Sequence, residues 1–205
     1  MTLSGFMAIK AMFTNDQTVF SAHEFTHEHG EARSSGHIVS AGQNLVFSAW
    51  FGKVRPTNNP MWTITKQPGT YVLILVNSRL GVLPIGQLGD LSLQPGVYVY
   101  VGSAWGPGGL AARVQHHYRI SSRPHWHIDY LRARCDLNRI WFTTASGRVE
   151  HKWAKALARL PKVTVPLQGF GASDCRCNTH LFWFPSPPSL RAFQRQVSTR
   201  VWAYP

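Results

Sequence analysis

Five residues of this chain have side chains that together could hydrolyse a phosphodiester bond. The reaction needs a base that activates water, positive charge beside the phosphate and a group that binds a metal ion. A tyrosine or histidine, an arginine and a carboxylate can supply these functions, and the planar fork of arginine can bind two phosphate oxygens. The five residues are Tyr71, Tyr100, Arg113, His117 and Glu150.

An ordinary structural interpretation of these residues is also open. Tyrosines are common in sheets, an arginine is usual on a surface, and the helix dipole would stabilise Glu150 in a first turn. Spacing alone favours this ordinary interpretation. Carboxylates are scarce, however, because only five occur between residues 61 and 205, so a Mg²⁺ site there has few possible ligands.

A second group of residues has the side chains of a zinc site, namely His125, His127, Cys175, Cys177 and His180. Zinc sites usually take four nitrogen or sulfur ligands, with paired cysteines separated by about two to four residues. A single residue separates Cys175 from Cys177, so the sequence favours buried thiols and hydrogen-bonded histidines over zinc. In Ser173-Asp174-Cys175, a cysteine nucleophile with His180 as its base is a further alternative, although no third member is visible.

The excess positive charge of the chain lies after residue 60. Residues 1–60 hold four basic and four acidic groups, whereas residues 61–205 hold 17 and five, and 17 − 5 gives +12. A segment this basic suits a polyanion, because each neutralised phosphate releases counterions. Acidic lipids attract the same charge, but we expect nucleic acid, and DNA in particular.

The cellular location is predicted from what the sequence lacks. Three cysteines, an odd and small number, do not indicate a disulfide framework. No run approaches the roughly 20 apolar residues of a membrane span, and the N-terminus lacks the pattern of a secretory signal. We therefore expect a cytoplasmic protein with no membrane partner.

Apolar runs predict a small antiparallel sheet. Near-continuous β-branched and aromatic residues indicate the strands, and alternation puts Tyr98 and Tyr100 on one face of their strand. Pro84 allows at most an edge strand over 82–88. The main strands are predicted over 70–76, 97–101, 140–144 and 180–184.

Apolar periodicity predicts helices over 110–120, 125–131, 149–160 and 190–197. In the first helix, Arg113 and His117 are four residues apart and share a face. In the third, Glu150 lies in the first turn, off the apolar stripe. Ser189 is the expected N-cap of the last helix.

The segment 125–131 allows two interpretations. As a strand it would put His125, His127 and Asp129 on one side. As a helix it would stack His125 over Asp129, and the good helix formers that follow favour the helix.

Five motifs resemble those of the GIY-YIG nuclease superfamily, in particular an uncharacterised-domain branch found alone or fused to endonuclease III-like repair enzymes. The motifs are GTY (69–71), YVYVGSA (98–104), LAARVQHH (110–117), HWHIDYL (125–131) and GFGASDCRCNTHLF (169–182). The resemblance implies a compact mixed α/β domain, with a three-stranded antiparallel sheet flanked by helices. It also implies a nuclease that uses one metal ion.

The resemblance assigns roles to residues at matching positions. A signature tyrosine helps to activate water, Arg113 steadies the scissile phosphate, and His117 is a polar residue four positions on. Glu150 is the best-placed match for the carboxylate that binds Mg²⁺ or Mn²⁺. The first signature contains Gly69 and Tyr71. The second contains Tyr100, Gly102 and Ser103.

Two features depart from the superfamily pattern. Tyr71 and Tyr100 are 29 residues apart, further than is usual between the signatures, and an inserted strand or hairpin over 80–94 would account for this. The HWHIDYL and SDC segments resemble features of the uncharacterised-domain branch that the wider superfamily does not share. Their residues are expected near the cleft without assigned roles, namely His125, His127, Asp129, Ser173, Asp174, Cys175 and His180.

These observations predict an N-terminal extension with poor order over 1–60, a nuclease domain over 61–185 and a C-terminal helix or tail over 186–205. The expected function is a metal-dependent DNA endonuclease, which could act in repair beside a repair enzyme. A non-catalytic nucleic-acid-binding module on the same scaffold is the main alternative. Hydrolysis of another substrate by His125, His127 or Cys175 is the third.

Overall fold

The protein is described here from a computed structural model, which covers the backbone of residues 8–14 and 17–23 and all atoms of residues 64–204. In the N-terminal unit, β1 (Ala8–Thr14) and β2 (Gln17–His23) pair in antiparallel fashion. The domain boundary predicted at residue 60 lies outside the described residues.

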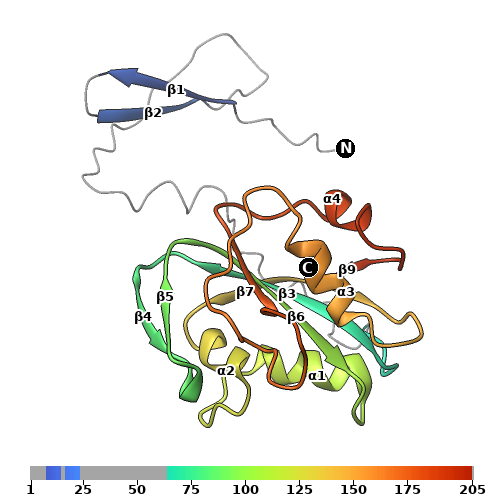
Figure 1. Ribbon diagram of the computed structural model, residues 1–205. Helices are drawn as coiled ribbons and strands as arrows, with labels where there is room; N and C mark the ends of the chain where they lie inside the picture. The colour runs from blue at the N-terminus through green and yellow to red at the C-terminus, as the bar shows by residue number, and fades with distance from the viewer. Residues whose placement is uncertain (1–7, 15–16, 24–63, 205) are drawn as a thin grey trace. The chain divides into compact units, whose positions relative to one another are not determined.

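The second unit is built on a five-stranded antiparallel sheet (Figure 1). Its strands are β3 (Gly69–Asn77), β6 (Gly96–Ala104), β7 (Asp136–Thr143), β8 (Leu181–Phe184) and β9 (Trp202–Tyr204). Their order is β8-β6-β3-β7-β9. The predicted mixed α/β architecture is confirmed, and β8 and β9 extend the predicted three-stranded sheet on both sides. Residues after 185 therefore contribute a strand to the same sheet.

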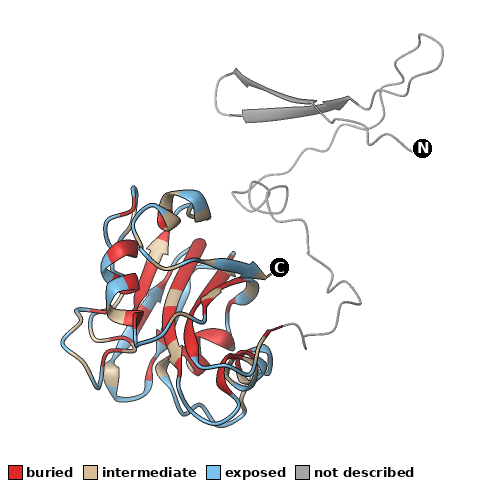
Figure 2. Cartoon of the chain, turned by 90° about the vertical axis from the view of Figure 1, so that its right-hand side faces the viewer, coloured by how far each residue is buried: buried red, intermediate tan, exposed pale blue. Residues whose placement is uncertain are grey.

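Helices cover both faces of this sheet (Figure 1). Helices α1 (Gly109–Tyr118) and α2 (His127–Arg132) pack on one face, against residues such as Leu73 and Tyr98. Helices α3 (Glu150–Leu157) and α4 (Leu190–Gln194) pack on the other, against residues such as Val99. The predicted alternation of tyrosines and valines along β6 is thus confirmed, and β3 and β6 are buried along most of their length (Figure 2).

A short hairpin accounts for the long separation between Tyr71 and Tyr100. It consists of β4 (Gly81–Pro84), a 3₁₀ turn η2 (Gly86–Leu88) and β5 (Asp90–Leu93), which form a two-stranded sheet of their own. The edge strand predicted over 82–88 is wrong in extent, since it ends at Pro84. Because the insertion folds separately, Tyr71 still pairs directly with Gly102.

At one end of the main sheet, the start of β3 lies beside the ends of β6 and β7, and the candidate functional site is built there. Strand β3 begins there, whereas β6 and β7 end there, because both are antiparallel to β3 and pair Tyr71 with Gly102 and Phe142. The chain leaves β6 toward α1 and leaves β7 toward α3. The topology therefore brings the first turn of α3 and helix α1 to the same end of the sheet.

Helix α2 begins later than predicted, at His127. The Asp129 carboxylate accepts hydrogen bonds from the backbone N–H groups of His125 and Trp126, each at 3.0 Å, which caps the helix from its N3 position. His125 lies before the helix, so the predicted stacking of its side chain over Asp129 is wrong. The predicted cap of α4 is confirmed, because Ser189 Oγ accepts from the N–H of Ala192 at 3.3 Å.

Candidate functional site

A cleft of about 350 Å³ lies at the sheet end where β3 begins. Twelve of the residues singled out in the sequence line it: Tyr71, Tyr100, Gly102, Ser103, Arg113, His117, His125, His127, Glu150, Ser173, Asp174 and His180. Gly69, Asp129 and Cys175 are not among its lining residues. Segments up to 109 residues apart, from Tyr71 to His180, thus contribute to one cavity.

Tyr71 and His117 form a buried hydrogen-bonded pair, with 2.7 Å between the phenol oxygen and Nε2. Their side chains are 2% and 1% exposed, respectively. Burial lowers the pKa of His117 to about 3, so the imidazole is neutral at neutral pH. Burial raises the pKa of Tyr71 well above its ordinary value, so the phenol keeps its proton. The neutral imidazole can accept that proton in the tautomer that is protonated on Nδ1.

Gly102 explains how the Tyr71 ring reaches this position. A Cβ atom on Gly102 would lie 2.5 Å from Cζ of Tyr71, far inside ordinary contact. The ring therefore lies across the bare backbone of the neighbouring strand. Tyr100 is beside it, with ring centroids 6.5 Å apart, and burial raises the pKa of Tyr100 to about 12.

Arg113 is held over the indole of Trp126, with 4.1 Å from its Cζ to the ring centroid. Such a cation–π contact fixes the guanidinium without neutralising its charge. Arg113 and His117 are one turn apart on α1 and both face the cleft, as predicted. Burial of His117 was not expected from the sequence, and it follows because Leu110, Val114 and His117 share the packed stripe of α1.

Asp129 supports the cleft from outside. Besides capping α2, its carboxylate lies 3.0 Å from His116 Nε2. Burial opposes the charged form, but the two backbone N–H groups and His116 outweigh it and hold the pKa of Asp129 below its ordinary value. His116 also packs edge-on against Trp126, with centroids 4.7 Å apart, so this network fixes the platform on which Arg113 rests.

His127 ties the glycine- and cysteine-bearing loop to the cleft. The N–H of Gly171 donates to His127 Nδ1 at 3.0 Å, and burial lowers the pKa of that imidazole. Gly171 adopts φ of +68°, and a Cβ atom there would lie 2.7 Å from Cε2 of Tyr100. The loop backbone therefore closes directly over Tyr100.

Glu150 is the first residue of α3 and is only 5% exposed. The prediction that it lies in the first turn is confirmed, but the prediction that it lies off the apolar stripe is wrong. Glu150 is spaced three, four and seven residues from buried Trp153, Ala154 and Leu157, so it lies on the packed face of α3. Its Oε2 is buried and has no hydrogen-bond partner among the described residues. Its Oε1 lies 3.8 Å from Nε2 of His151. An unpaired buried carboxylate oxygen is costly unless a ligand satisfies it.

Two clusters in the described region have the side chains and spacing to hold a metal ion. One consists of His116, His117 and Asp129, whose atoms already hydrogen-bond as described above. The other consists of His151, Cys175, Cys177 and His180. The predicted pair of Cys175 and His180 is thus in contact, at 3.5 Å between Sγ and Nε2, but as part of this larger cluster. His125 and His127 do not belong to it.

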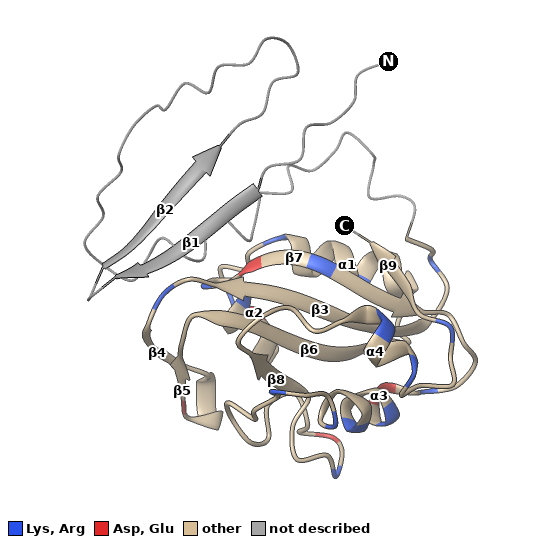
Figure 3. Ribbon diagram, turned by 90° about the horizontal axis from the view of Figure 1, so that it is seen from above, with Lys and Arg blue, Asp and Glu red and all other residues tan. Residues whose placement is uncertain are grey.

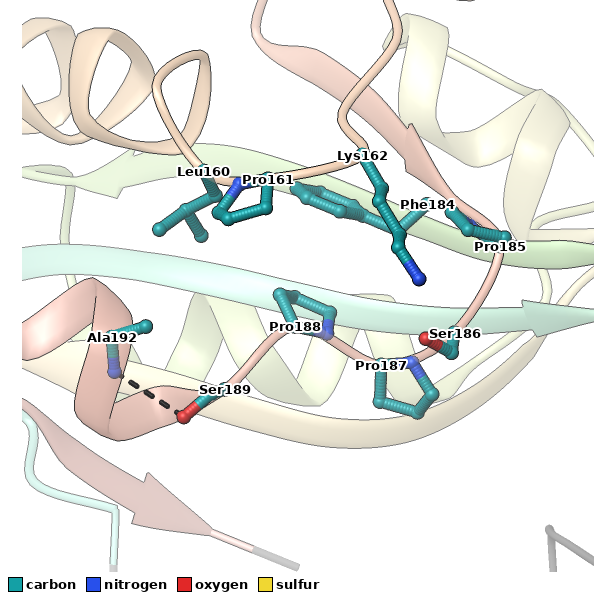
Figure 4. Close-up of a pocket in the computed structure, with 10 residues that line it drawn as sticks. All are labelled: Leu160, Pro161, Lys162, Phe184, Pro185, Ser186, Pro187, Pro188, Ser189 and Ala192. Atoms are coloured by element: carbon teal, nitrogen blue, oxygen red, sulfur yellow. Dashed lines mark hydrogen bonds between the residues drawn. The ribbon is translucent and has the colours of Figure 1, made fainter.

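A second, smaller cavity of about 190 Å³ lies between the end of α3 and the segment that leads to α4 (Figure 4). Prolines 185, 187 and 188 line it together with Phe184 and Leu160, and Lys162 is its one ionisable lining residue. Ser186 and Ser189 also line it, but no histidine, cysteine or carboxylate does, so no lysine or serine there has an acid–base partner within the lining.

The positive charge of the domain is unpaired. Across residues 64–204, no Lys or Arg nitrogen lies within 4.0 Å of a carboxylate oxygen, and the close pairs there both involve histidine. Lys and Arg occur on strands, helices and loops, whereas Asp and Glu are few (Figure 3). This charge is available to a polyanionic ligand. None of the helices in the described ranges has the length and apolarity needed to cross a bilayer.

Sequence reasoning missed several residues that line the cleft, namely Trp126, Ile128, Arg148, His151 and Gly171. Trp126 lies inside the HWHIDYL motif, and His151 follows Glu150 directly, so proximity to singled-out residues was an available signal for both. Arg148 has no comparable local signal.

Comparison with known proteins places the chain in one family. No curated protein and no solved structure shows significant similarity to it. The family described as "Domain of unknown function DUF123" matches residues 70–203, which run from the second residue of β3 through α4 to the second residue of β9. That range also contains all the residues that line the cleft. The chain belongs to the DUF123 family.

Proposed function

We propose that this protein is a metal-dependent endonuclease that hydrolyses phosphodiester bonds in DNA, and that its domain is related to the GIY-YIG superfamily. The observation that carries the proposal is the convergence of five side chains on one cleft, namely Tyr71, Tyr100, Arg113, His117 and Glu150. Four elements contribute them, namely β3, β6, α1 and α3, and the inserted hairpin does not separate them. Together they supply the base, the positive charge and the metal ligand that phosphodiester hydrolysis requires.

Arg113 is the group proposed to bind the scissile phosphate. Its guanidinium is held by Trp126 at 4.1 Å and has no carboxylate partner among residues 64–204, so its charge and its planar fork stay available. Arg148 lines the same cleft and adds a second guanidinium. Positive charge fixed in advance stabilises the extra negative charge that develops on phosphorus in the transition state.

The Tyr71–His117 pair is proposed to move the proton of the attacking water. His117 is neutral and lies 2.7 Å from the phenol oxygen, so its Nε2 accepts the phenolic hydrogen bond. Burial also makes this imidazole a weak base, so it is proposed to take the full proton only as charge develops in the transition state. The phenol oxygen can at the same time accept a proton from water in the cleft. Because both side chains are buried, the pair keeps its geometry while the proton moves.

Glu150 is the residue proposed to hold the metal ion. Its buried Oε2 has no hydrogen-bond partner among the described residues, and a carboxylate oxygen is a ligand that Mg²⁺ and Mn²⁺ prefer. A Mg²⁺ or Mn²⁺ ion bound there would act as a Lewis acid on the phosphate and its leaving oxygen. Asp174 lines the same cleft and is the second carboxylate within it.

The unpaired charge of the domain supports DNA as the substrate, but it would equally support a binding module without catalysis. Seventeen basic groups against five acidic ones after residue 60 predict strong, salt-dependent binding to a phosphate backbone. A role in DNA repair and a cytoplasmic location are parts of the same proposal. A preference for nicked or branched DNA over plain duplex would support the repair role.

Incubation of the purified protein with nicked, branched and plain duplex DNA tests the proposal. Each substrate is assayed with Mg²⁺, with Mn²⁺ and with EDTA, and binding is measured in parallel by a mobility shift. We expect cut products with either metal and none with EDTA. Binding that survives EDTA, with no product under any condition, would replace the nuclease with a binding module.

A further inference from the structure

We propose that His151, Cys175, Cys177 and His180 bind one Zn²⁺ ion as a closed, four-ligand site at the edge of the cleft. One ligand atom from each of the four lies within 4.8 Å of every other. Two thiolates and two imidazoles form a ligand set that suits zinc and does not suit Mg²⁺ or Mn²⁺. This site is separate from the metal proposed at Glu150 and goes beyond the proposed nuclease function.

The distances within the cluster fit a tetrahedron around one ion. With Zn–S near 2.3 Å and Zn–N near 2.0 Å, a sulfur and a nitrogen on the same zinc are about 3.6 Å apart. Cys177 Sγ lies 3.3 Å from His151 Nδ1, and Cys175 Sγ lies 3.5 Å from His180 Nε2. These two sulfur–nitrogen distances are therefore close to the value expected when both atoms bind one zinc ion.

The backbone around the cluster holds these four side chains in place. The N–H of Cys177 donates to Cys175 Sγ at 3.4 Å, and this contact fixes the position of that sulfur. His180 is fixed on both sides, since its N–H donates to Phe170 O at 2.8 Å and its carbonyl accepts from Val101 at 2.9 Å. The short separation of Cys175 from Cys177 is no obstacle, because the other two ligands come from elsewhere.

The proposed ion would join two parts of the chain that wall the cleft. His151 belongs to the first turn of α3, directly after Glu150, whereas the other three ligands belong to the loop that follows Gly171. With its Nδ1 on zinc, His151 would present Nε2–H toward Glu150 Oε1, which is 3.8 Å away. Carboxylates commonly orient zinc-bound histidines in this way. Since all four positions are protein ligands, the ion would have a structural role and would not activate water.

The metal content of the full-length protein, purified under reducing conditions, tests this site without any DNA. We expect one equivalent of zinc per chain, lost to background in Cys177→Ser and in His151→Gln. Cys135→Ala is the matched control, because Cys135 is buried in the core and outside the cluster, and it should keep its zinc. Zinc retained at full stoichiometry in Cys177→Ser would overturn the proposal.

A second measurement on the unmutated chain keeps the test decisive if the variants fail to fold. Cobalt added to the metal-free, reduced protein should give the intense visible bands of tetrahedral Co²⁺ and a thiolate-to-cobalt charge-transfer band. One equivalent of zinc should remove these bands and protect two of the three thiols from a thiol reagent. A reduced protein that binds neither ion, with Cys175 and Cys177 fully reactive toward the thiol reagent, would refute the site. Cleavage of DNA is measured separately, so either proposal can fail alone.

Discussion

Substitution of Gly102 by alanine perturbs the Tyr71–His117 pair without removing either member. The added Cβ would lie 2.5 Å from Cζ of Tyr71, whereas ordinary contacts begin at 3.4 Å. The difference, 3.4 − 2.5, requires the ring or the strand to move by about 0.9 Å. The ring cannot retreat freely, because it is buried and its hydroxyl is 2.7 Å from His117 Nε2.

Two effects of known size follow from that displacement. Overpacking of a buried position costs about 1–3 kcal/mol, so the free energy of unfolding should fall by that amount. Misplacement of a reacting group by about 1 Å can cost roughly 100-fold in rate, so DNA cleavage should fall by that factor. The loss of activity should therefore exceed what partial unfolding explains.

Urea denaturation and cleavage rates of Gly102→Ala check both effects. Gly106→Ala is the matched control, because a Cβ there meets no atom within 4 Å and its φ is not in the left-handed range. It should leave the free energy of unfolding and the cleavage rate close to those of the unmutated protein. A Gly102→Ala variant as stable and as active as this control would refute the reasoning.

Three further changes test individual contacts of the site. Arg113→Ala should lower cleavage roughly 10²–10³-fold, and Arg113→Lys should recover only part of the loss, because a point charge lacks the planar fork. Because burial lowers the pKa of His117 to about 3 from 6.5, the unfolded chain binds the extra proton between these values. The free energy of unfolding should therefore be fully retained above pH 6.5 and fall by up to about 1.4 kcal/mol per pH unit below it. In His117→Gln, this fall with decreasing pH should be less steep. His127→Ala should destabilise the protein by about 1 kcal/mol and speed hydrogen exchange at the Gly171 amide, whereas exposed His125→Ala should not.

Each of these expectations has an outcome that would contradict it. Full activity in Arg113→Lys would mean that only charge is needed at the phosphate. An unchanged pH slope in His117→Gln would assign the slope to the other imidazoles whose pKa is lowered, partly buried His127 and buried His180. Unchanged exchange at Gly171 in His127→Ala would mean that the loop is held by other contacts.

The sheet and its faces could be predicted because their residues carry the signal locally. The run from Tyr71 to Val76 is aromatic, β-branched or leucine throughout, as is typical of a strand covered on both faces, and the alternation along β6 assigns Tyr98 and Tyr100 to one face. Strand β9 could not be found in this way. Trp202, Ala203 and Tyr204 are too few to show a period, and their pairing with β7 decides their conformation.

The cleft could be predicted only in part, for a similar reason. Tyr71, Tyr100 and Arg113 belong to motifs that can be read along the chain, and the family resemblance indicated Glu150. His151 had no such signal as a metal ligand, because its partners are at least 24 residues away and lie in a loop. Burial of Glu150 follows from its place on the packed face of α3, one turn before Trp153 and Ala154, and it was missed because a carboxylate is not usually assigned to such a face.

Side-by-side cleavage by the unmutated protein and Glu150→Ala, over a Mg²⁺ titration, tests the central claim most directly. Glu150→Gln is the control of similar size, which keeps the shape of the side chain but removes the charge that holds the metal ion. Zinc content is measured on each sample, so that loss of the neighbouring cluster is not mistaken for loss of Glu150. The account predicts Mg²⁺-dependent cleavage by the unmutated protein and almost none by either variant. Undiminished cleavage in Glu150→Ala, or no cleavage by the unmutated protein with any metal, would contradict it.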